Sequence, residues 1–155
     1  MLERVIQLLE ANRWKYQLED DRSTVIFGIQ ANFGTIDCYI RIMEETGLFT
    51  MISFCMFEID DDKVDNFVEF TRYVNFGLFT GCFEFDEAKK QMRFRTNFFF
   101  DKENLPSLKL LHRSIMSHLL TIDNYFPAMM SLLFTDMTPE EALKEVEKMP
   151  LLSLN

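Results

Sequence analysis

Residues 72–100 constrain the fold of this chain more than any other segment. Apolar side chains alternate with polar ones on both sides of a charged turn, which is the period of two β-strands. If Phe83 pairs with Phe94, the same register places Glu84 opposite Arg93, and opposite charges are favourable cross-strand neighbours. The segment therefore predicts a β-hairpin with one aromatic face and one polar, solvated face.

The rest of the chain predicts helices around an antiparallel meander. Apolar residues at i, i+3, i+4 and i+7 indicate helices, and strict alternation indicates strands. A capping box at Thr138 and Glu141 begins the last helix, and Gly77 ends an earlier one. The predicted helices cover residues 2–13, 60–77, a stretch ending near Thr121, 127–134 and 139–148, and the predicted strands cover 24–31, 36–42 and 48–57 after a short extended piece at Trp14 and Tyr16. The fold class is therefore α+β, an antiparallel sheet of about five strands with helices packed on one face.

Composition limits both the domain organisation and the partners. A chain of 155 residues with 48% hydrophobic residues fits one domain, here residues 1–150, and we expect residues 151–155 to form a loose tail. The net charge of −9 opposes binding to nucleic acid or to an anionic membrane. The N-terminal segment alternates apolar and charged residues and lacks the apolar core of a signal peptide or membrane span, so we expect a cytoplasmic protein.

The strand at residues 48–57 differs from the others because it is apolar on both faces. One face needs a helix, and the other needs a second element or subunit, for which a homodimer is one plausible cover. Phenylalanine and methionine, which are abundant here with 17 and ten residues, are enriched in adaptable protein-binding surfaces as well as in cores. The residues that we expect to contact a protein partner or client segment are Phe49, Met51, Phe57, Phe70, Tyr73, Met129 and Met130.

The residues that could carry chemistry favour no enzyme. His112 and His118 are six residues apart, which turns them to different sides of a helix, whereas zinc binding prefers a spacing of four. The acidic run from Asp60 to Asp62 lacks the glycine and distal glutamate of a calcium loop and is better interpreted as a helix cap. No nucleophile or phosphate-loop motif occurs, and the three cysteines fit reduced, buried thiols. We therefore expect no cofactor, no metal and no catalytic residue.

An alternative function uses the polar face of the sheet. The charged side chains on outward positions of neighbouring hairpins could line a pocket for a small ligand, although ordinary cross-strand pairs on a solvated face explain them as well. This alternative would make the protein a small-ligand sensor or an uncharacterised enzyme. The residues of this candidate pocket are Asp37, Arg41, Glu84, Arg93 and Arg95.

The segment YVNFGLFTGCFEFDEAKKQMRFR resembles the signature region of the YbjN-like bacterial proteins, which are regarded as sensory transduction regulators. In that pattern a helix ends in Asn, a strand with glycine and an aromatic residue follows, and a basic strand returns. The order of elements is also similar over nearly the whole chain. The resemblance implies the fold of type III secretion chaperones, often a homodimer, and a non-enzymatic chaperone-like or regulatory role without catalytic residues. The matching residues are Asn75, Gly81, Phe83, Asp86, Arg93 and Arg95.

Overall fold

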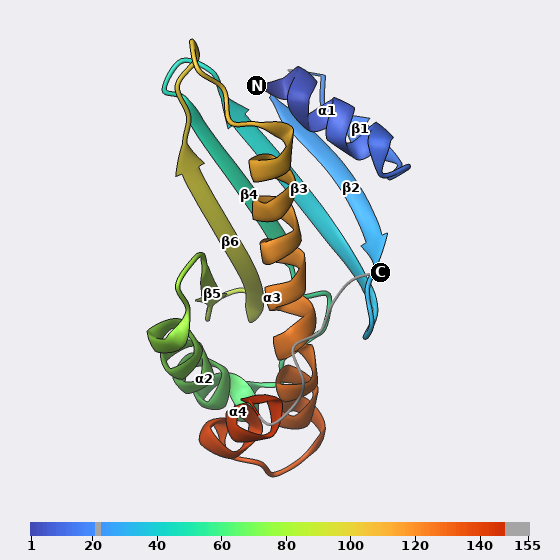
Figure 1. Cartoon of the computed structure of the whole chain (residues 1–155). Helices are drawn as coiled ribbons and strands as arrows, with labels where there is room; N and C mark the ends of the chain where they lie inside the picture. Colours follow the sequence, from blue (N-terminus) through green and yellow to red (C-terminus); the bar gives the residue numbers. More distant parts are fainter. Residues whose placement is uncertain (21–22, 148–155) are drawn as a thin grey trace.

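The computed structural model describes residues 1–20 and 23–147, so the predicted helix end near Lys148 and the tail at 151–155 lie outside the described residues. It contains four α-helices, a short 3-10 helix and six strands within these ranges (Figure 1). In chain order the elements are α1 (Leu2–Ala11), β1 (Tyr16–Leu18), β2 (Thr24–Gln30), β3 (Thr35–Met43), β4 (Leu48–Phe54), the 3-10 helix η1 (Asp61–Lys63), α2 (Val64–Gly77), β5 (Cys82–Asp86), β6 (Gln91–Phe99), α3 (Leu108–Phe134) and α4 (Pro139–Glu147).

The strands form one antiparallel sheet in the order β1-β2-β3-β4-β6-β5. The α+β prediction is confirmed, with β1 as one strand more than the five expected. The hairpin register is also confirmed, since Phe83 pairs with Phe94 and Glu84 with Arg93. The hairpin joins the meander through β6 rather than β5, so α2 and β5 lie between the paired strands β4 and β6 in the chain. The shorter strand β5 consequently lies at the edge of the sheet.

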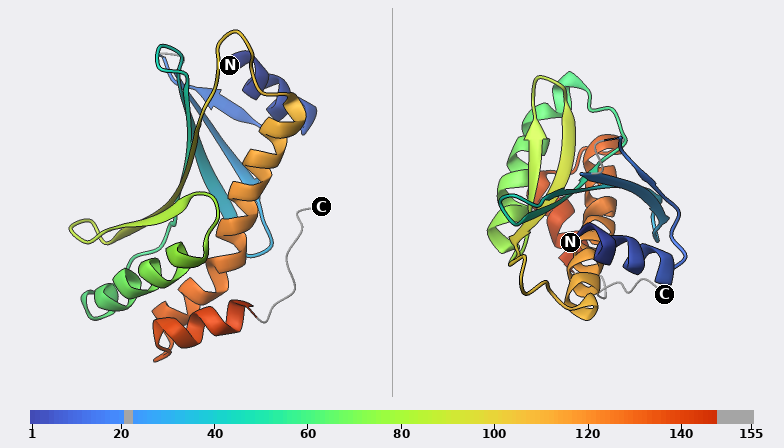
Figure 2. Two further views of the ribbon diagram at one scale, coloured as in Figure 1. Left: turned by 60° about the vertical axis from the view of Figure 1, so that its left-hand side comes forward. Right: turned by 90° about the horizontal axis from the view of Figure 1, so that it is seen from above.

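Helix α3 crosses one face of the sheet, and the core lies between them (Figures 1 and 2). The inward residues of β2, β3, β4 and β6 are buried in alternation, as the period of a strand requires. Helix α1 contacts α3 near the start of α3, whereas α2 and α4 contact each other, and α4 also contacts α3. The predicted capping box is present, because the Glu141 carboxylate accepts from the backbone N–H of Thr138 at 2.9 Å and the Thr138 hydroxyl accepts from the backbone N–H of Glu141 at 3.3 Å.

The prediction of two helices separated near Thr121 is wrong, since α3 runs without a break from Leu108 to Phe134 and contains Pro127. A proline inside a helix removes one backbone hydrogen bond and crowds the preceding turn, which was the reason for expecting a break. The continuous buried stripe of α3 compensates, because Ile122, Ala128 and Met129 on both sides of this position are all buried. Packing of one long apolar face thus outweighs the local preference.

Asn75 and Gly81, which belong to the segment that resembles the YbjN-like proteins, fix the path from α2 into the hairpin. The side chain of Asn75 donates to the carbonyl of Phe83 and accepts from its N–H, both at 2.8 Å. Gly81 has a φ of +76°, and a Cβ atom there would lie 2.5 Å from the Phe94 ring and 2.6 Å from the Thr96 methyl group. These two residues therefore have structural reasons for their identity.

Replacing Gly47 with alanine should lower the free energy of unfolding by roughly 1–3 kcal/mol. The backbone conformation at this position is strained for any residue other than glycine, and a neighbouring atom leaves no space for a Cβ. The φ of Gly47 is +66°, and an added Cβ would collide with the carbonyl oxygen of Phe100. Gly77→Ala is the matched control, since its Cβ would meet open space. Urea unfolding of both variants measures the difference, and an equal stability for both would contradict this account of the turn.

Candidate functional site

The structure places most of the predicted partner-binding residues inside the core, which corrects the sequence-based assignment. Phe49, Met51, Phe70 and Met129 are each at most 1% exposed, so none can contact a partner in this conformation. They fill the layer between the sheet, α2 and α3, and the sequence alone could not assign them to the inward side. Of the other three predicted residues, Phe57 and Met130 are half-buried, whereas Tyr73 is exposed and donates its hydroxyl to Glu69 at 2.7 Å.

The five residues of the predicted polar pocket fall into separate groups. Glu84 accepts from Arg93 Nε at 2.6 Å and from Arg95 at 2.5 Å, so these three form one ion-pair cluster. Asp37 and Arg41 lie on β3, and the side chains of β4 stand between them and this cluster. The structure therefore forms no single pocket from the five residues.

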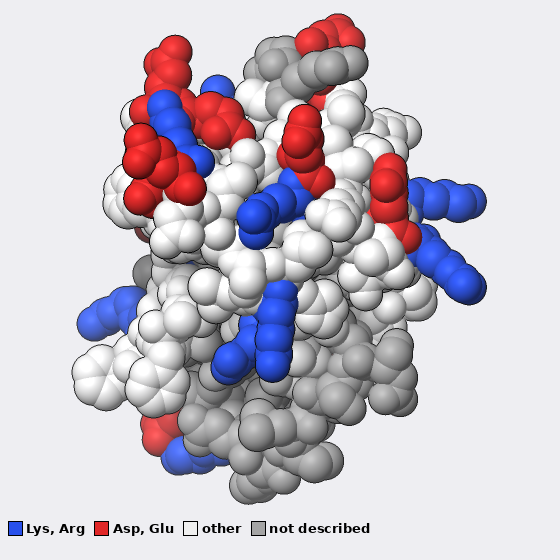
Figure 3. Space-filling model, turned by 45° about the horizontal axis from the view of Figure 1, so that its top comes forward, with Lys and Arg blue, Asp and Glu red and all other residues white. Residues whose placement is uncertain are grey.

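The Glu84 cluster joins one carboxylate to two guanidinium groups and therefore carries a net positive charge. Partial burial favours the neutral acid, but the hydrogen bonds and charges of Arg95 and Arg93 outweigh it and hold the pKa of Glu84 below its ordinary value. Both guanidinium groups bind the same carboxylate, so each arginine has an ion-pair partner within the chain. Basic and acidic side chains are also interspersed over the face of the molecule seen in Figure 3.

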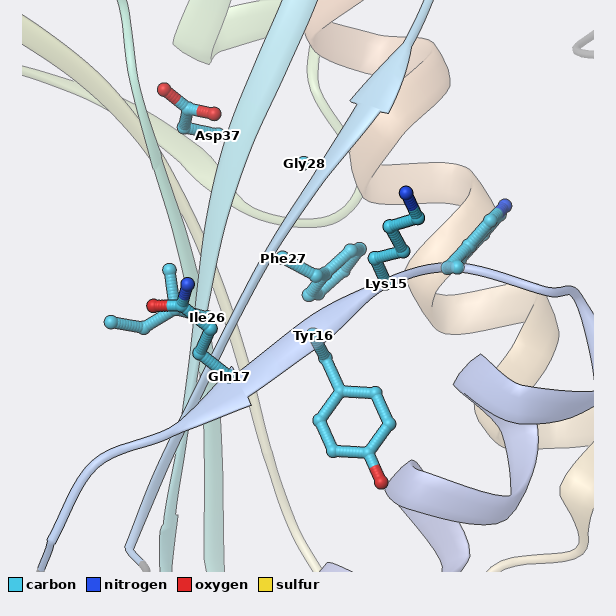
Figure 4. Close-up of a pocket in the computed structure, with 8 residues that line it drawn as sticks. Lys15, Tyr16, Gln17, Ile26, Phe27, Gly28 and Asp37 are labelled. Carbon is cyan, nitrogen blue, oxygen red and sulfur yellow. The ribbon is translucent and has the colours of Figure 1, made fainter.

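Asp37 belongs to a different, open pocket at the β1 side of the sheet (Figure 4). Lys15 lies on one side of Gly28 and Asp37 lies on β3 at its other side. The Trp14 ring stacks on Phe27 with 5.7 Å between their centroids. The pocket is lined from both faces of this edge of the sheet, since Phe27 faces the core whereas Asp37 pairs with Gly28 on the outer face.

The outer face of the sheet carries no helix within the described residues. On this face Tyr39 of β3, Ile52 of β4 and Phe54 of β4 are half-buried, and the Tyr39 and Phe54 rings meet edge to face at 5.6 Å. The Glu84 cluster lies on one side of this apolar strip and Arg41 on the other. An apolar centre with a charged rim is the arrangement of a protein interface.

A second exposed apolar surface lies where α3 and β6 diverge. A groove of about 1060 Å³ opens there, bounded by β6, the first half of α3, the loop between them and the loop before β5. Phe79 in that loop is fully exposed and Phe99 at the end of β6 is 77% exposed. The sequence pattern could not reveal this groove, because β5 is shorter than β6 and only the register shows which part of β6 it leaves uncovered.

A chain of hydrogen bonds runs from the groove into the core, and the sequence analysis missed it. Thr96, which lines the groove, bonds to His118 Nδ1 at 2.9 Å, and His118 Nε2 lies 3.0 Å from Ser53 Oγ. Ser53 in turn donates to Cys38 Sγ at 3.2 Å. If the Ser53 hydroxyl donates to Cys38, it accepts from His118 Nε2–H, which leaves Nδ1 to accept from Thr96.

This buried chain is structural and not a nucleophilic site. Ser53, His118 and Cys38 have no exposed surface, so a substrate cannot reach the hydroxyl. Burial lowers the pKa of His118 to about 3 and raises the pKa of Cys38 to about 12, which keeps the imidazole and the thiol neutral. Cys55 is also buried, with a pKa raised to about 12 by burial, whereas Cys82 is half-buried rather than buried as expected; all three are free thiols.

Residues 1–20 and 23–147 contain neither a metal-site cluster nor a membrane-spanning helix. In these ranges no group of three or more His, Cys, Asp or Glu side chains has the arrangement of a metal site. None of the helices in the same part of the chain combines the length and apolarity required to cross a membrane.

Comparison with known proteins identifies similarity in sequence and in fold. The YbjN family, described as "Putative bacterial sensory transduction regulator", matches residues 1–130. The fold is similar to the crystal structure of YbjN from E. coli, described as "a putative transcription regulator", with a TM-score of 0.59 and 10% sequence identity. That alignment covers 86% of this chain and 89% of the other. None of the curated proteins compared matches the sequence.

Proposed function

The chain belongs to the YbjN family of bacterial proteins, and from that premise we propose that it is a non-enzymatic, chaperone-like regulator that binds a segment of another protein. The observation that carries this proposal is the groove beside β6, with Phe79 fully exposed and Phe99 largely exposed at its rim. Exposed aromatic side chains around a concavity favour a protein partner, because burying them releases apolar surface from water. We place this regulator in the cytoplasm.

The proposal also assigns no nucleic acid or lipid partner. The net charge of −9 repels phosphate groups, and Arg93 and Arg95 of the hairpin both form ion pairs with Glu84. A segment of protein that buries aromatic surface is the ligand that this surface chemistry favours. The small-ligand alternative receives less support, since Asp37 and Arg41 are separated from Arg93 and Arg95 by β4.

Capture of partners on the immobilised full chain tests the proposed function. A Phe79→Ser, Phe99→Ser double variant should capture at least tenfold less partner protein than the unmodified chain, because it lacks both aromatic rings at the rim of the groove. Both rings are exposed, so their removal leaves the core intact. Exposed Phe33→Ser on the β2–β3 turn, at 43% exposure, is the matched control and should capture as well as the unmodified chain. Equal capture by all three proteins would contradict the assignment to this groove.

The outer face of the sheet is the surface that we propose for a homodimer. Two copies of the strip of Tyr39, Ile52 and Phe54 would cover each other, and the surrounding charges would form the rim. Ile52→Glu should convert a dimer to a monomer, because it places a carboxylate in the centre of the interface. Light scattering after size-exclusion chromatography measures the mass. The exposed Gln30→Glu should remain dimeric, and a monomeric unmodified chain would overturn the dimer.

A further inference from the structure

The C-terminal part of β6, at Asn97 and Phe99, is a free sheet edge. Its even-numbered residues direct their backbone groups toward β4, since Phe100 N–H donates to Gly47 and Met92 C=O accepts from Cys55. Odd-numbered residues therefore direct theirs toward β5. The last β5 pair is Cys82 with Arg95, so Asn97 and Phe99 extend past the end of β5.

The backbone groups of Asn97 and Phe99 on that side have no strand partner among the described residues. Unpaired N–H and C=O groups in a row are a template for another strand. Both residues also line the groove, which continues from this edge to α3. The groove thus combines two features: backbone groups that can pair with an extended chain, and apolar surface on either side of that edge.

The side chains around the edge specify what an added strand must carry. Phe99 projects on the outer face, whereas Phe98 and Leu110 line the groove on the inner side, so alternate residues of the strand meet apolar surface on both faces. Arg113 of α3 also lines the groove, is exposed, and makes no ion pair within the described part of the chain. In a chain with a net charge of −9, an unpaired guanidinium at this position favours a carboxylate on the ligand.

We propose that the free edge of β6 at Asn97 and Phe99 binds an extended segment of a partner protein as an added β-strand, with apolar residues against Phe99 and Leu110 and an acidic residue paired with Arg113. This inference rests on the proposed function and adds the binding mode and the chemistry of the bound segment. Binding by strand addition gives affinity through the backbone and selectivity through the alternating side chains.

The test uses a phage-displayed library of random 12-residue peptides selected on the immobilised full chain. Enriched sequences should alternate apolar residues and contain Asp or Glu. A synthetic peptide of the most enriched sequence should bind Asn97→Pro and Arg113→Glu at least tenfold more weakly than the unmodified chain by fluorescence anisotropy. Asn97→Pro removes an edge N–H that makes no ladder bond, and Arg113→Glu changes an exposed residue; circular dichroism checks that both remain folded.

Arg72→Glu on α2 is the charge-matched control and should bind the peptide like the unmodified chain, because Arg72 is exposed and does not line the groove. In hydrogen exchange, the amides of Asn97 and Phe99 should become protected when the peptide is added. Failure to enrich any peptide overturns the proposal. Enriched peptides that bind the edge variants equally overturn strand addition while leaving the proposed function standing, and self-association lost in Asn97→Pro assigns the edge to a second copy instead.

Discussion

Asp123→Ala should lower the free energy of unfolding by roughly 2 kcal/mol, because a buried carboxylate at this position ties α3 to the β2–β3 turn. The side chain is 2% exposed. It accepts from the backbone N–H of Asn32 at 3.2 Å, from its side-chain amide at 2.5 Å and from the backbone N–H of Phe33 at 3.1 Å. Removing the carboxylate leaves three N–H donors of Asn32 and Phe33 without their protein acceptor and opens a gap beside the helix.

Urea unfolding measures the loss, and hydrogen exchange locates it. The amides of Asn32 and Phe33 should exchange faster in Asp123→Ala, since their acceptor is gone, while amides in the centre of β4 should change only with global stability. Asp136→Ala, at an exposed position after α3, is the control and should stay within about 0.5 kcal/mol of the unmodified chain. A loss equal to that of the control would show that the turn does not depend on Asp123.

The role of Asp123 marks the limit of what local sequence patterns predict. An acidic residue within a helical pattern is ordinarily assigned to solvent, and Asp123 precedes a proline that favours a helix end. Its partners lie 90 and 91 residues earlier in the chain. Only tertiary placement of the β2–β3 turn over α3 turns this residue into a buried anchor.

The hairpin, by contrast, was predictable down to its register. Alternating aromatic residues fixed which side faces the core, and the pairing of Glu84 with Arg93 removed the remaining ambiguity. Burial of Phe83, Met92 and Phe94 on one side, with the ion-pair cluster on the other, is the result. Local pattern and tertiary structure agree in this segment, which is also the segment that resembles the family.

Strand β4 shows why the sequence did not reveal that Phe49 and Met51 are buried. Apolar residues occur on both of its faces, so the hydrophobic pattern does not show which face is toward the core. From the sequence, Phe49 and Met51 could have faced either side. The inward side is marked instead by a polar residue, Ser53, because its hydroxyl bonds to His118 of α3. The composition of a strand cannot show such a partner 65 residues away.

The buried His118 should make stability depend on pH in a range where carboxylates do not titrate. In the folded chain burial lowers its pKa from 6.5 to about 3, whereas the unfolded chain retains the ordinary value. Between these values the unfolded state binds the additional proton, so stability is full above pH 6.5 and falls as the pH decreases. The expected loss is roughly 2 kcal/mol between pH 7.5 and pH 5.

Comparison of the unmodified chain with His118→Gln isolates this contribution. The variant should be less stable at pH 7.5, because glutamine cannot fill the imidazole site between Ser53 and Thr96, but its stability should change little from pH 7.5 to pH 5. The carboxylates with lowered pKa, including Glu84 and Glu141, add their losses only below about pH 4.5. Parallel stability curves for the two proteins above pH 5 would show that the imidazole becomes protonated within the folded core. In that case the Thr96 hydroxyl would accept a hydrogen bond from Nδ1–H instead of donating one, while Nε2–H would still donate to Ser53.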